Sequence, residues 1–320
     1  MYKVAVFGAG GYSGIELLKL LAHHPDVQVV CAASDGLAPS FVGDQTGIYG
    51  PMRFVTLAEA EQVAADVAFL CVPAEPAAPL AAALVSRMRV IDLSHAHRGV
   101  AGVPYGLVSL FGDEVREARL VANPGCYATA VITALAPLVR DHLIEHEIPV
   151  VAYSGVTGAG RKVDQGFALG ELYGNVHAYR VLAHQHVPEM ERSLARVATG
   201  PAPRVIFTPH LLPLARGILA TATVKLRAPR TTAQLIEVFE RAYGDDPTVE
   251  VARRPEAVGL REVVGTPRCR VGVATDGTFA IVTAALDNLM KGAASQAIEN
   301  FNLMHGLPRL RGLEHATRFA

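Results

Sequence analysis

Apolar positions in the first 140 residues occur either in short continuous runs or in longer stretches at helical spacing. The short runs predict buried strands over Lys3–Phe7, Val27–Ala33, Asp66–Val72, Arg89–Ser94 and Leu120–Ala122. The longer stretches predict helices over Ile15–His23, Pro76–Arg87 and Tyr127–Arg140. Because strand and helix alternate, this part of the chain is expected to form a doubly wound parallel sheet, which is an α/β architecture.

From Val150 the pattern changes, because strand-like runs follow one another with few long helices between them. Strands are predicted over Val150–Tyr153, Val205–Phe207, Leu219–Leu226, Cys269–Ala274 and Thr278–Ala285, and helices over Thr231–Tyr243 and Asp287–Met304. These runs are typical of an α+β domain with a mixed or antiparallel sheet. We therefore expect one domain over residues 1–148 and a second over 149–286. Residues 287–320 would add a helix that returns to the first domain, with a basic surface tail after Pro308.

Length and composition agree with two globular domains. The chain has 320 residues, 51% of them hydrophobic, and a net charge of -1 with no block of like charge. This balance argues against a nucleic-acid partner, and no apolar run is long enough to span a bilayer. The four cysteines form no CxxC pair, so we expect a cytoplasmic protein without disulfides or a metal framework. The N-terminus enters a strand directly, so no targeting leader is expected.

The first predicted strand runs directly into a glycine-rich turn, Gly8-Ala-Gly-Gly-Tyr-Ser-Gly14, which opens a helix. Glycines in this order allow a tight turn, close approach of the backbone to a pyrophosphate, and close packing of helix on sheet. The pyrophosphate would bind the N–H groups that open the helix. The motif therefore predicts a Rossmann-like dinucleotide site. Its residues would be Gly8, Gly10, Gly11, Tyr12, Ser13 and Gly14.

Ser34 and Asp35 follow the second predicted strand, where such folds contact the ribose of the dinucleotide. A carboxylate there favours NAD, whereas a hydroxyl or basic group favours NADP. This pair of residues leaves both cofactors open.

Cys126 follows the sharp turn Asn123-Pro124-Gly125, at or near the start of the helix predicted from Tyr127. Unpaired N–H groups and the positive end of the helix dipole stabilise a thiolate at such a position. Most free cysteines are simply small buried hydrophobic residues. Here the turn and the upstream dinucleotide motif favour a nucleophile, because Cys126 also lies at the carboxyl end of a predicted parallel strand.

The second domain offers several polar candidates. The loop Ser154–Lys162 is rich in glycine, including Gly158, and could bring bare backbone to a ligand. His184 and His186 could act as acid or base beside a thiolate, and they lack partners at zinc-ligand spacing. Arg161, Lys162 and Arg216 could form an anion pocket. A dinucleotide fold with a thiolate and a histidine favours acyl transfer coupled to hydride transfer through a thioester.

The chain resembles the family of N-acetyl-gamma-glutamyl-phosphate reductases, NADPH-dependent enzymes of arginine biosynthesis related to aspartate-semialdehyde dehydrogenase. The resemblance extends over nearly the whole chain. It rests on the glycine turn extended to Leu18 and on Asp92–Ser94, Tyr105–Leu107, Ala122–Tyr127, Ser154–Lys162, His177–Tyr179, His184–Glu189, Phe207–Leu211, Arg216–Leu219 and Leu286–Ala293.

This resemblance implies reductive dephosphorylation of N-acetylglutamyl 5-phosphate to the semialdehyde, with Cys126 forming the acyl-enzyme. NADP is the implied cofactor, NAD not being excluded, and the second domain is expected to form a homodimer or homotetramer. One or both of His184 and His186 would be acid/base or contact substrate. The other implied contacts are Arg98, Asn123, Ser154 and Arg216 for the substrate, and Ser34, Gly158 and Asn288 for the cofactor.

Some segments depart from the pattern of the family. Asp92-Leu-Ser-His-Ala-His-Arg98 stands where Asp-Leu-Ser-Ala-Asp-Phe-Arg is usual, and the segment from there to Tyr105 is short. Pro73-Ala-Glu75 replaces Pro-His-Gly, and Tyr105-Gly-Leu-Val-Ser109 replaces Tyr-Gly-Leu-Pro-Glu. His184-Gln-His186 replaces His-Arg-His. A sister reductase acting on a carrier-bound aminoadipyl or glutamyl phosphate, or a dinucleotide-binding protein without turnover, remain the alternatives.

Overall fold

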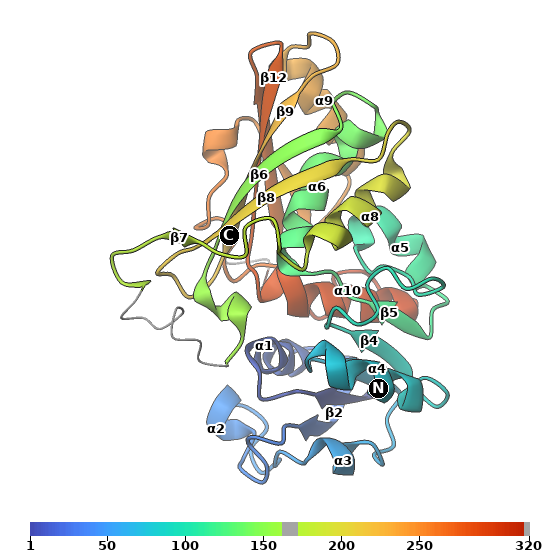
Figure 1. The fold of residues 1–320 in the computed structure, drawn as a ribbon. Coiled ribbons are helices and arrows are strands. Elements are labelled where there is room, and N and C mark those ends of the chain that lie inside the picture. The colour runs from blue at the N-terminus through green and yellow to red at the C-terminus, as the bar shows by residue number, and fades with distance from the viewer. Residues whose placement is uncertain (162–171, 317–320) are drawn as a thin grey trace. The chain divides into compact units, whose positions relative to one another are not determined.

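A computed structural model describes residues 1–161 and 172–316 of the chain. By its internal contacts the chain divides into two compact units (Figure 1). The first unit contains Met1–Gly125 and the segment that begins at Ala293, and the second contains Cys126–Gly292. Each unit is built around its own sheet.

The first unit contains a five-stranded sheet in the order β2-β1-β3-β4-β5, with every pair parallel. Its strands are β1 (Tyr2–Phe7), β2 (Val27–Ala33), β3 (Val67–Leu70), β4 (Arg89–Asp92) and β5 (Leu120–Ala122). Its helices up to β5 are α1 (Tyr12–Leu21), α2 (Gly43–Thr46), α3 (Leu57–Ala60), α4 (Ala74–Leu84) and α5 (Val108–Val115). The predicted doubly wound sheet is confirmed. The strand order reverses at β1, where such sheets bind their ligands.

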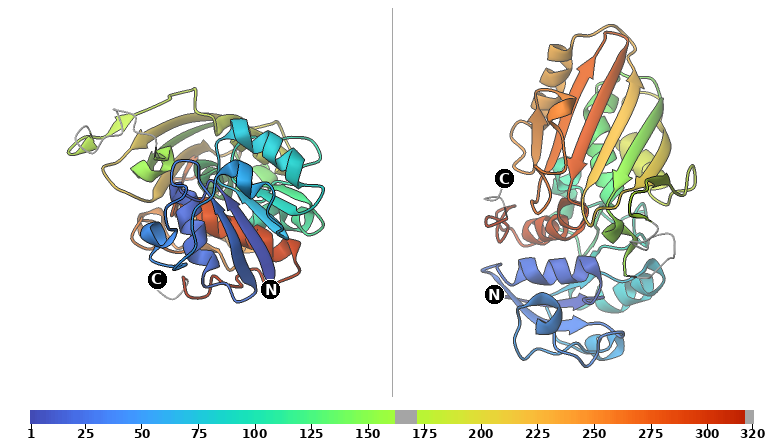
Figure 2. Two further views of the ribbon diagram at one scale, coloured as in Figure 1. Left: turned by 90° about the horizontal axis from the view of Figure 1, so that it is seen from below. Right: turned by 90° about the vertical axis from the view of Figure 1, so that its left-hand side faces the viewer.

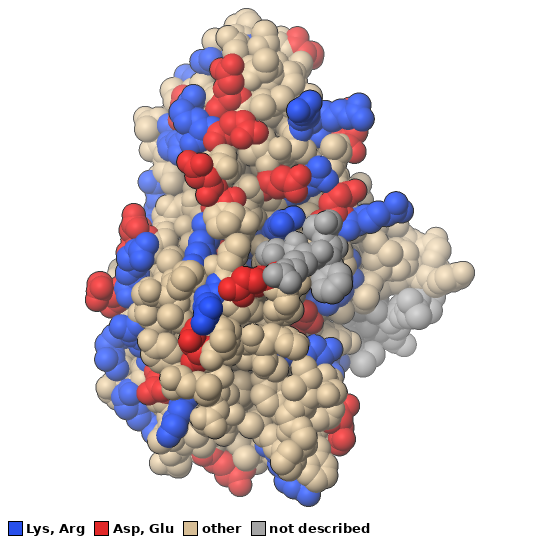
Figure 3. Space-filling model, turned by 180° about the vertical axis from the view of Figure 1, so that it is seen from behind, with Lys and Arg blue, Asp and Glu red and all other residues tan. Residues whose placement is uncertain are grey.

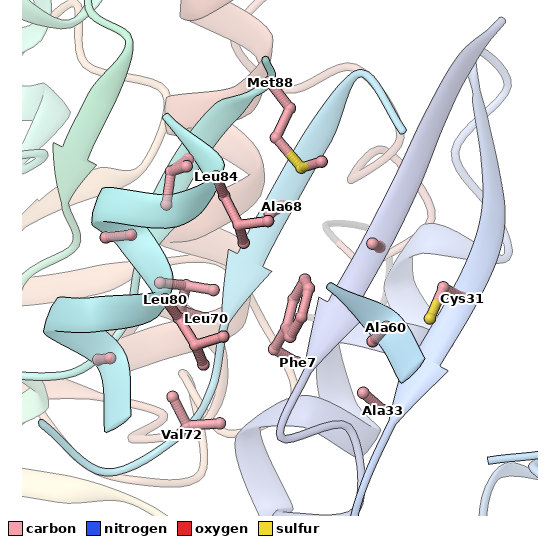
Figure 4. Packing of buried hydrophobic residues seen from close by; sticks show 14 residues of the cluster. Phe7, Cys31, Ala33, Ala60, Ala68, Leu70, Val72, Leu80, Leu84 and Met88 are labelled. Carbon is pink, nitrogen blue, oxygen red and sulfur yellow. The ribbon is translucent and has the colours of Figure 1, made fainter. Parts of the chain in front are cut away.

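Buried apolar side chains join the central strands to α4. Phe7 and Leu70 extend from the sheet toward Leu80 and Leu84 of α4, and Met88 closes the cluster beside the start of β4 (Figure 4). All five side chains are at most 6% exposed. Burial of this size stabilises the unit by roughly 1.5–3 kcal/mol for each large side chain. The apolar runs of the sequence therefore become strands because both faces of the sheet are covered.

The C-terminal region differs from the prediction in two ways. The helix expected over Asp287–Met304 starts later, as one π-helical turn (Met290–Ala294) followed by α10 (Ser295–Met304). Residues 309–316 do not form a surface tail, because Leu313 is fully buried and Arg309 forms an ion pair with Glu299 of α10 at 2.7 Å. Arg311 also pairs with Asp26 at 2.7 Å. These basic residues therefore fasten the segment to the first unit.

The second unit contains a mixed sheet of seven strands in the order β10-β11-β12-β9-β6-β8-β7. Its strands are β6 (Glu147–Ser154), β7 (His177–Ala178), β8 (Arg204–Leu211), β9 (Ile218–Lys225), β10 (Val249–Ala252), β11 (Cys269–Thr275) and β12 (Phe279–Leu286). Two pairs are parallel, β6 with β8 and β10 with β11, and the others are antiparallel. The expected α+β domain with a mixed sheet is confirmed.

Helices cover one face of this sheet. They are α6 (Cys126–Arg140), α8 (Val187–Val197) and α9 (Thr232–Tyr243), and the right-hand view of Figure 2 shows the strands in front of α6 and α8. Short 3-10 turns lie at Val156–Ala159 and Pro255–Ala257. Helix α6 is buried from Tyr127 to Val139 because it packs on β9, β12 and α8. The units therefore divide at Gly125, whereas the sequence placed the boundary at residue 148, because α6 packs with the second sheet.

Charged side chains of both signs are interspersed on the face of the molecule that Figure 3 shows. This distribution agrees with the net charge of -1. Among the described residues, none of the helices combines the length and the apolar character that crossing a membrane requires.

His24 is buried in the first unit and uses both ring nitrogens. Nδ1 accepts the N–H of Asp26 at 3.2 Å, so Nε2 carries the proton and donates to Asn302 Oδ1 at 3.0 Å. Burial lowers the pKa of His24 below its ordinary value of 6.5. As the pH falls below that value, the unfolded chain takes up a proton that the folded state does not bind, so stability declines.

We expect the free energy of unfolding to fall by at most about 1.4 kcal/mol per pH unit below about pH 6.5 through this one side chain. In His24→Gln, which cannot titrate, part of the pH dependence of urea unfolding should disappear. His95→Gln, at an exposed position of the same unit, is the matched control and should behave as the wild type. Equal pH dependence in both variants would contradict the assignment.

Candidate functional site

Cys126 is the first residue of α6, a helix of 15 residues, and it is partly exposed. The predicted position at a helix N-terminus is confirmed. The Asn123-Pro124-Gly125 turn before it cannot continue a helix backward, because proline disfavours helical conformation in the residue before it. Cys126 therefore lies at the positive end of the α6 dipole, which favours a thiolate.

The other three cysteines have different surroundings. Burial raises the pKa of Cys31 to about 11, and it raises the pKa of Cys71 and of Cys269 to about 12. A thiol with such a pKa is almost entirely protonated near neutral pH and is a poor nucleophile. All four cysteines are free thiols. Its place at a helix N-terminus thus distinguishes Cys126 from the other three cysteines.

The strands of the second sheet end together at one edge. Ser154 of β6 pairs with Leu211 of β8 and with Ile218 of β9, and Ile218 pairs in turn with Leu286 of β12. The segments that follow or precede these four residues therefore lie at the same edge. They are residues 155–160, 212–217 and 287–292, and they contain the candidates Gly158, Arg216 and Asn288.

The 287–292 segment packs directly against Cys126. The N–H of Gly292 donates to the Asp287 carbonyl at 2.9 Å, which is the bond that defines a π-helical turn. A Cβ atom at Gly292 would lie 2.7 Å from the Cβ of Cys126, so only glycine fits. The sequence motif contained Gly292 but did not reveal this contact, because a π turn has no pattern of its own.

Asp287 holds this turn in place. Its fully buried carboxylate accepts the N–H groups of Leu289 and Met290 at 2.8 and 3.2 Å. It also forms an ion pair with Arg216 at 3.2 Å. The guanidinium of Arg216 is therefore bound to a buried carboxylate and helps to hold the turn. The predicted contact with a substrate anion would be a second role of the same side chain. Lys291, also fully buried, donates to Thr248 Oγ1 at 2.8 Å.

Asn288 joins two of the loops at this edge. Its Oδ1 accepts the N–H of Gly217 at 2.8 Å, and its Nδ2 donates to Thr157 Oγ1 at 3.0 Å. A Cβ on Gly158 would lie 3.4 Å from Ser154 Oγ and 3.8 Å from Asn288 Nδ2. The structure therefore brings Ser154, Gly158 and Asn288 together. Asn288 is held rigidly and keeps a second N–H on Nδ2 with which it could bind a carboxamide.

His184 and His186 lie in an aromatic cluster. Their ring centroids are 4.9 Å apart, and both rings face Tyr127, at 5.3 Å for His184 and 6.2 Å for His186. Phe207 packs against His184 at 5.4 Å. The structure thus gathers both predicted histidines around the residue that follows Cys126. Among the described residues, no group of three or more His, Cys, Asp or Glu side chains is placed to hold a metal ion.

The two histidines differ in what they can do. His184 Nδ1 accepts the backbone N–H of His186 at 3.2 Å, so the proton of a neutral His184 ring is on Nε2. Burial, followed by the nearby charge of Arg180, lowers the pKa of His184 to about 4. Near neutral pH His184 is therefore an uncharged hydrogen-bond donor. His186 is also buried, and it is the N-cap residue of α8.

Two tyrosine hydroxyls lie close to Cys126 and were not assigned a role from the sequence. Tyr179 donates to the Tyr127 hydroxyl at 3.2 Å, and Tyr127 donates to the His210 carbonyl at 3.4 Å. Burial raises the pKa of Tyr179 to about 12, and the Cys126 charge acts in the same direction. The Tyr179 side chain is therefore near enough to sense a thiolate. The motif His177–Tyr179 was the only sequence signal for it.

In the first unit, the glycine turn has the geometry that its sequence predicted. Gly8 has φ of +77°, and a Cβ there would collide with the Cys71 carbonyl. A Cβ on Gly10 would collide with Ser34 Oγ, and one on Gly14 would lie 2.5 Å from the Gly8 carbonyl oxygen. Gly11 is the N-cap of α1 and has no side-chain cap. Within the described parts of the chain, no side chain caps the start of α1, and the glycine turn places bare backbone beside it, which fits the phosphates of a dinucleotide.

The remaining residues of the motif begin α1. Tyr12 is its first residue and is 37% exposed, and Ser13 hydrogen-bonds the Cys71 thiol. At the end of β2, Ser34 packs against Gly10, while Asp35 Oδ1 accepts the N–H of Leu57 at 2.8 Å. In the sequence, Asp35 left NAD and NADP both open. In the structure its carboxylate binds the first N–H group of α3.

Arg98 and Asn123 meet at the carboxyl ends of β4 and β5. Arg98 donates from Nε to the Asn123 carbonyl and from Nη2 to the Leu93 carbonyl, each at 2.8 Å. The Asn123 side chain bonds Ala293 and Asn300. Arg161 is exposed, and Lys162 lies outside the described residues. The predicted anion pocket of Arg161, Lys162 and Arg216 therefore stays a prediction.

Two family models match the chain. Residues 3–118 match the NAD binding domain of semialdehyde dehydrogenase, and residues 126–288 match the semialdehyde dehydrogenase dimerisation domain. Together they cover most of both compact units. The interval between the two matches contains the turn that precedes Cys126.

Curated relatives match over nearly their full length. An N-acetyl-gamma-glutamyl-phosphate reductase from Geobacillus thermodenitrificans is 39% identical over 342 aligned positions, which cover 97% of this chain and 98% of the relative. A protein of the same name from a Bradyrhizobium species is 36% identical over 321 positions, with 98% of each chain covered.

Solved structures of lower identity show the same fold. Aspartate semialdehyde dehydrogenase II from Vibrio cholerae aligns with a TM-score of 0.77 and 20% identity, covering 96% of this chain and 98% of that one. The aspartate semialdehyde dehydrogenase from Candida albicans, solved with NADP, aligns with a TM-score of 0.68, 15% identity and coverage of 96% and 99%. By its sequence and by the fold of both units, this chain belongs to the semialdehyde dehydrogenase family, together with the N-acetyl-gamma-glutamyl-phosphate reductases.

Proposed function

We propose that the protein is an NADP-dependent N-acetyl-gamma-glutamyl-phosphate reductase of arginine biosynthesis. The observation that carries the proposal is Cys126, a partly exposed thiol on the first residue of α6. It lies in a chain that is 36–39% identical to reductases of that name over nearly its full length. The substrate would be N-acetyl-L-glutamyl 5-phosphate and the product its 5-semialdehyde.

The Cys126 thiolate attacks the acyl carbon of the acyl phosphate, and the bond to the phosphate oxygen breaks. Inorganic phosphate leaves and a thioester remains on the sulfur. The N–H groups that begin α6 stabilise the thiolate before attack. The Gly292 backbone, packed against the Cys126 side chain, limits the positions that the sulfur can take. The cofactor, when bound, supplies the hydride that reduces the acyl group to an aldehyde.

His186 would move the proton in this scheme. Hydride addition to the thioester leaves an oxyanion on the acyl carbon. If this oxygen takes up a proton, it must lose the proton again when the carbon–sulfur bond breaks and the aldehyde forms. His184 is unsuited to that transfer, because its lowered pKa keeps it neutral. Its Nε2–H can instead donate a hydrogen bond within the aromatic cluster. In this proposal the two rings differ because burial lowers the pKa of His184 and because the backbone N–H of His186 occupies its Nδ1.

The cofactor would bind the first unit at the glycine turn Gly8–Gly14, with its pyrophosphate at the N-terminus of α1. Asp35 Oδ1 already accepts the Leu57 N–H, which favours Ser34 as the contact at the ribose end and so supports NADP. Asn288 would hold the nicotinamide carboxamide through its remaining N–H. Because the thiol must stay reduced, a reducing compartment such as the cytoplasm suits this chemistry.

The second unit would hold two copies of the chain together. On the sheet face opposite to the helices, β6, β9 and β12 expose uncharged side chains, among them Val151, Ile281 and Phe279, at 38, 37 and 46% exposure. This face also exposes Glu147 and Lys225, one charge of each sign, at the ends of β6 and β9. An apolar sheet face with few charges is typical of a protein interface. The matched family is described as a dimerisation domain, which supports a second copy as the partner, in a homodimer or homotetramer.

The purified protein is expected to oxidise N-acetylglutamate 5-semialdehyde in the presence of phosphate and NADP, with NADPH absorbance as the readout. Cys126→Ser should retain NADP binding yet lose at least about 1,000-fold in turnover, since a hydroxyl is far less ionised than a thiol. Assays with NAD at equal concentration measure the cofactor preference. Near-normal turnover of Cys126→Ser would exclude the covalent route.

Alkylation should distinguish Cys126 from the other thiols. Iodoacetamide near neutral pH is expected to modify Cys126 first, because burial raises the pKa values of Cys31, Cys71 and Cys269. Peptide mass spectrometry of the folded protein measures the order of modification, and Cys126→Ser provides the matched control. Faster labelling of Cys71 or Cys269 in the folded state would show that the proposed reactivity is wrong.

The double variant Val151→Asp/Ile281→Asp should shift the protein toward a monomer, because two buried carboxylates without partners would oppose association. Sedimentation velocity measures the change. Ala233→Asp, on an exposed position of α9, is the matched control and should leave the oligomer intact. An unchanged sedimentation coefficient in the double variant would place the interface elsewhere.

A further inference from the structure

Asp92 and His97 form a carboxylate–imidazole pair in the first unit. His97 Nδ1 lies 2.7 Å from Asp92 Oδ2. Asp92 is the last residue of β4 and is fully buried, and its carboxylate also accepts the N–H and the hydroxyl of Ser94 at 2.8 and 2.9 Å. A carboxylate that binds Nδ1 fixes both the tautomer and the orientation of an imidazole. The His97 ring is therefore held in one position.

The other nitrogen of His97 remains accessible. The side chain is 13% exposed, and within the described residues its ring forms only the contact with Asp92. Nε2 is not among the polar atoms that are buried without a partner. The ring thus has one end fastened to a buried carboxylate and the other end available to a ligand. A purely structural histidine at this depth usually bonds with both nitrogens, as His24 does.

The surroundings of His97 favour an anionic ligand. Arg98, the next residue, donates to the carbonyls of Leu93 and Asn123, which directly follow β4 and β5. Asp92 is close enough to Cys71 for its charge to raise the pKa of that thiol, and Cys71 bonds Ser13 in the first turn of α1. An imidazole, a guanidinium and a helix N-terminus therefore occupy the carboxyl edge of one parallel sheet, where such sheets bind phosphates.

We propose that His97, oriented by Asp92, binds a phosphate oxygen through Nε2 and forms an anion site with Arg98. Nε2 donates to a phosphate oxygen when the ring is protonated and accepts a phosphate hydroxyl when it is neutral, so the ring suits both ionised forms. The phosphate belongs either to the acyl phosphate and its product or to the dinucleotide. This inference rests on the proposed function, because both sources are reactants there.

The test uses two substitutions at position 97 in the full chain. In His97→Asn the amide nitrogen can take the place of Nδ1 and keep the bond to Asp92, but nothing replaces Nε2. In His97→Gln the amide nitrogen reaches the place of Nε2. We expect His97→Asn to raise KM for inorganic phosphate, in the oxidative direction, about tenfold or more, with a smaller rise in His97→Gln. KM for NADP should change by less than about twofold.

A rise in KM for NADP alone would assign the site to the dinucleotide phosphate and would equally support an anion site. His95→Asn, at an exposed position in the same segment, is the matched control and should leave both KM values unchanged. If His97→Asn leaves both KM values at the wild-type level, His97 only fastens its loop and the inference is overturned.

Calorimetry separates this inference from the proposed function. Titration of wild-type protein and of His97→Asn with inorganic phosphate, and separately with NADP, requires no turnover. Weaker binding of either by the variant supports the anion site even if the wild type fails to reduce the expected substrate. Equal affinities of the two proteins for both probes would overturn it, whatever the turnover.

Discussion

The contact between Gly292 and Cys126 constrains the rest of the site. A Cβ at position 292 would lie 2.7 Å from the Cβ of Cys126, so only the bare backbone of a glycine fits at this point. The π-helical turn brings that backbone there, and Asp287 holds the turn by accepting two N–H groups and pairing with Arg216. Asn288, next to Asp287, is fixed by the same turn. The position of the sulfur thus depends on the buried carboxylate of Asp287, the residue that directly follows β12.

In each unit, the candidate residues lie where strands of its own sheet end. In the first unit, the glycine turn, Ser34, Asp92 and Arg98 lie at the carboxyl ends of parallel strands. In the second unit, the register of β6, β8, β9 and β12 aligns their ends, so that loops distant in sequence meet. Backbone hydrogen bonds between strands therefore set the geometry of both sets of groups, and the loops only carry the side chains.

Buried polar groups explain why some segments were difficult to interpret from the sequence. Helix α10 is buried over its whole length although it contains Glu299, Asn300 and Asn302. Glu299 is neutralised by Arg309, and Asn302 binds His24 and two carbonyls of the C-terminal segment. A charged stretch after Pro308 is typical of a solvated tail, yet it supplies the partners that these buried groups require.

The sequence by itself determined the five strands of the first unit, its helices α1 and α4, the glycine turn and the position of Cys126 at a helix N-terminus. These features depend on residues close together in the chain, through periodicity, glycine conformation and the effect of proline on its neighbour. Only the tertiary structure decided the π turn at Gly292, the aromatic surroundings of His184 and His186, the Tyr179–Tyr127 contact and the Asp92–His97 pair. Each of these depends on burial or on which side chains the packed strands and loops bring together, and neither quantity is encoded in local spacing.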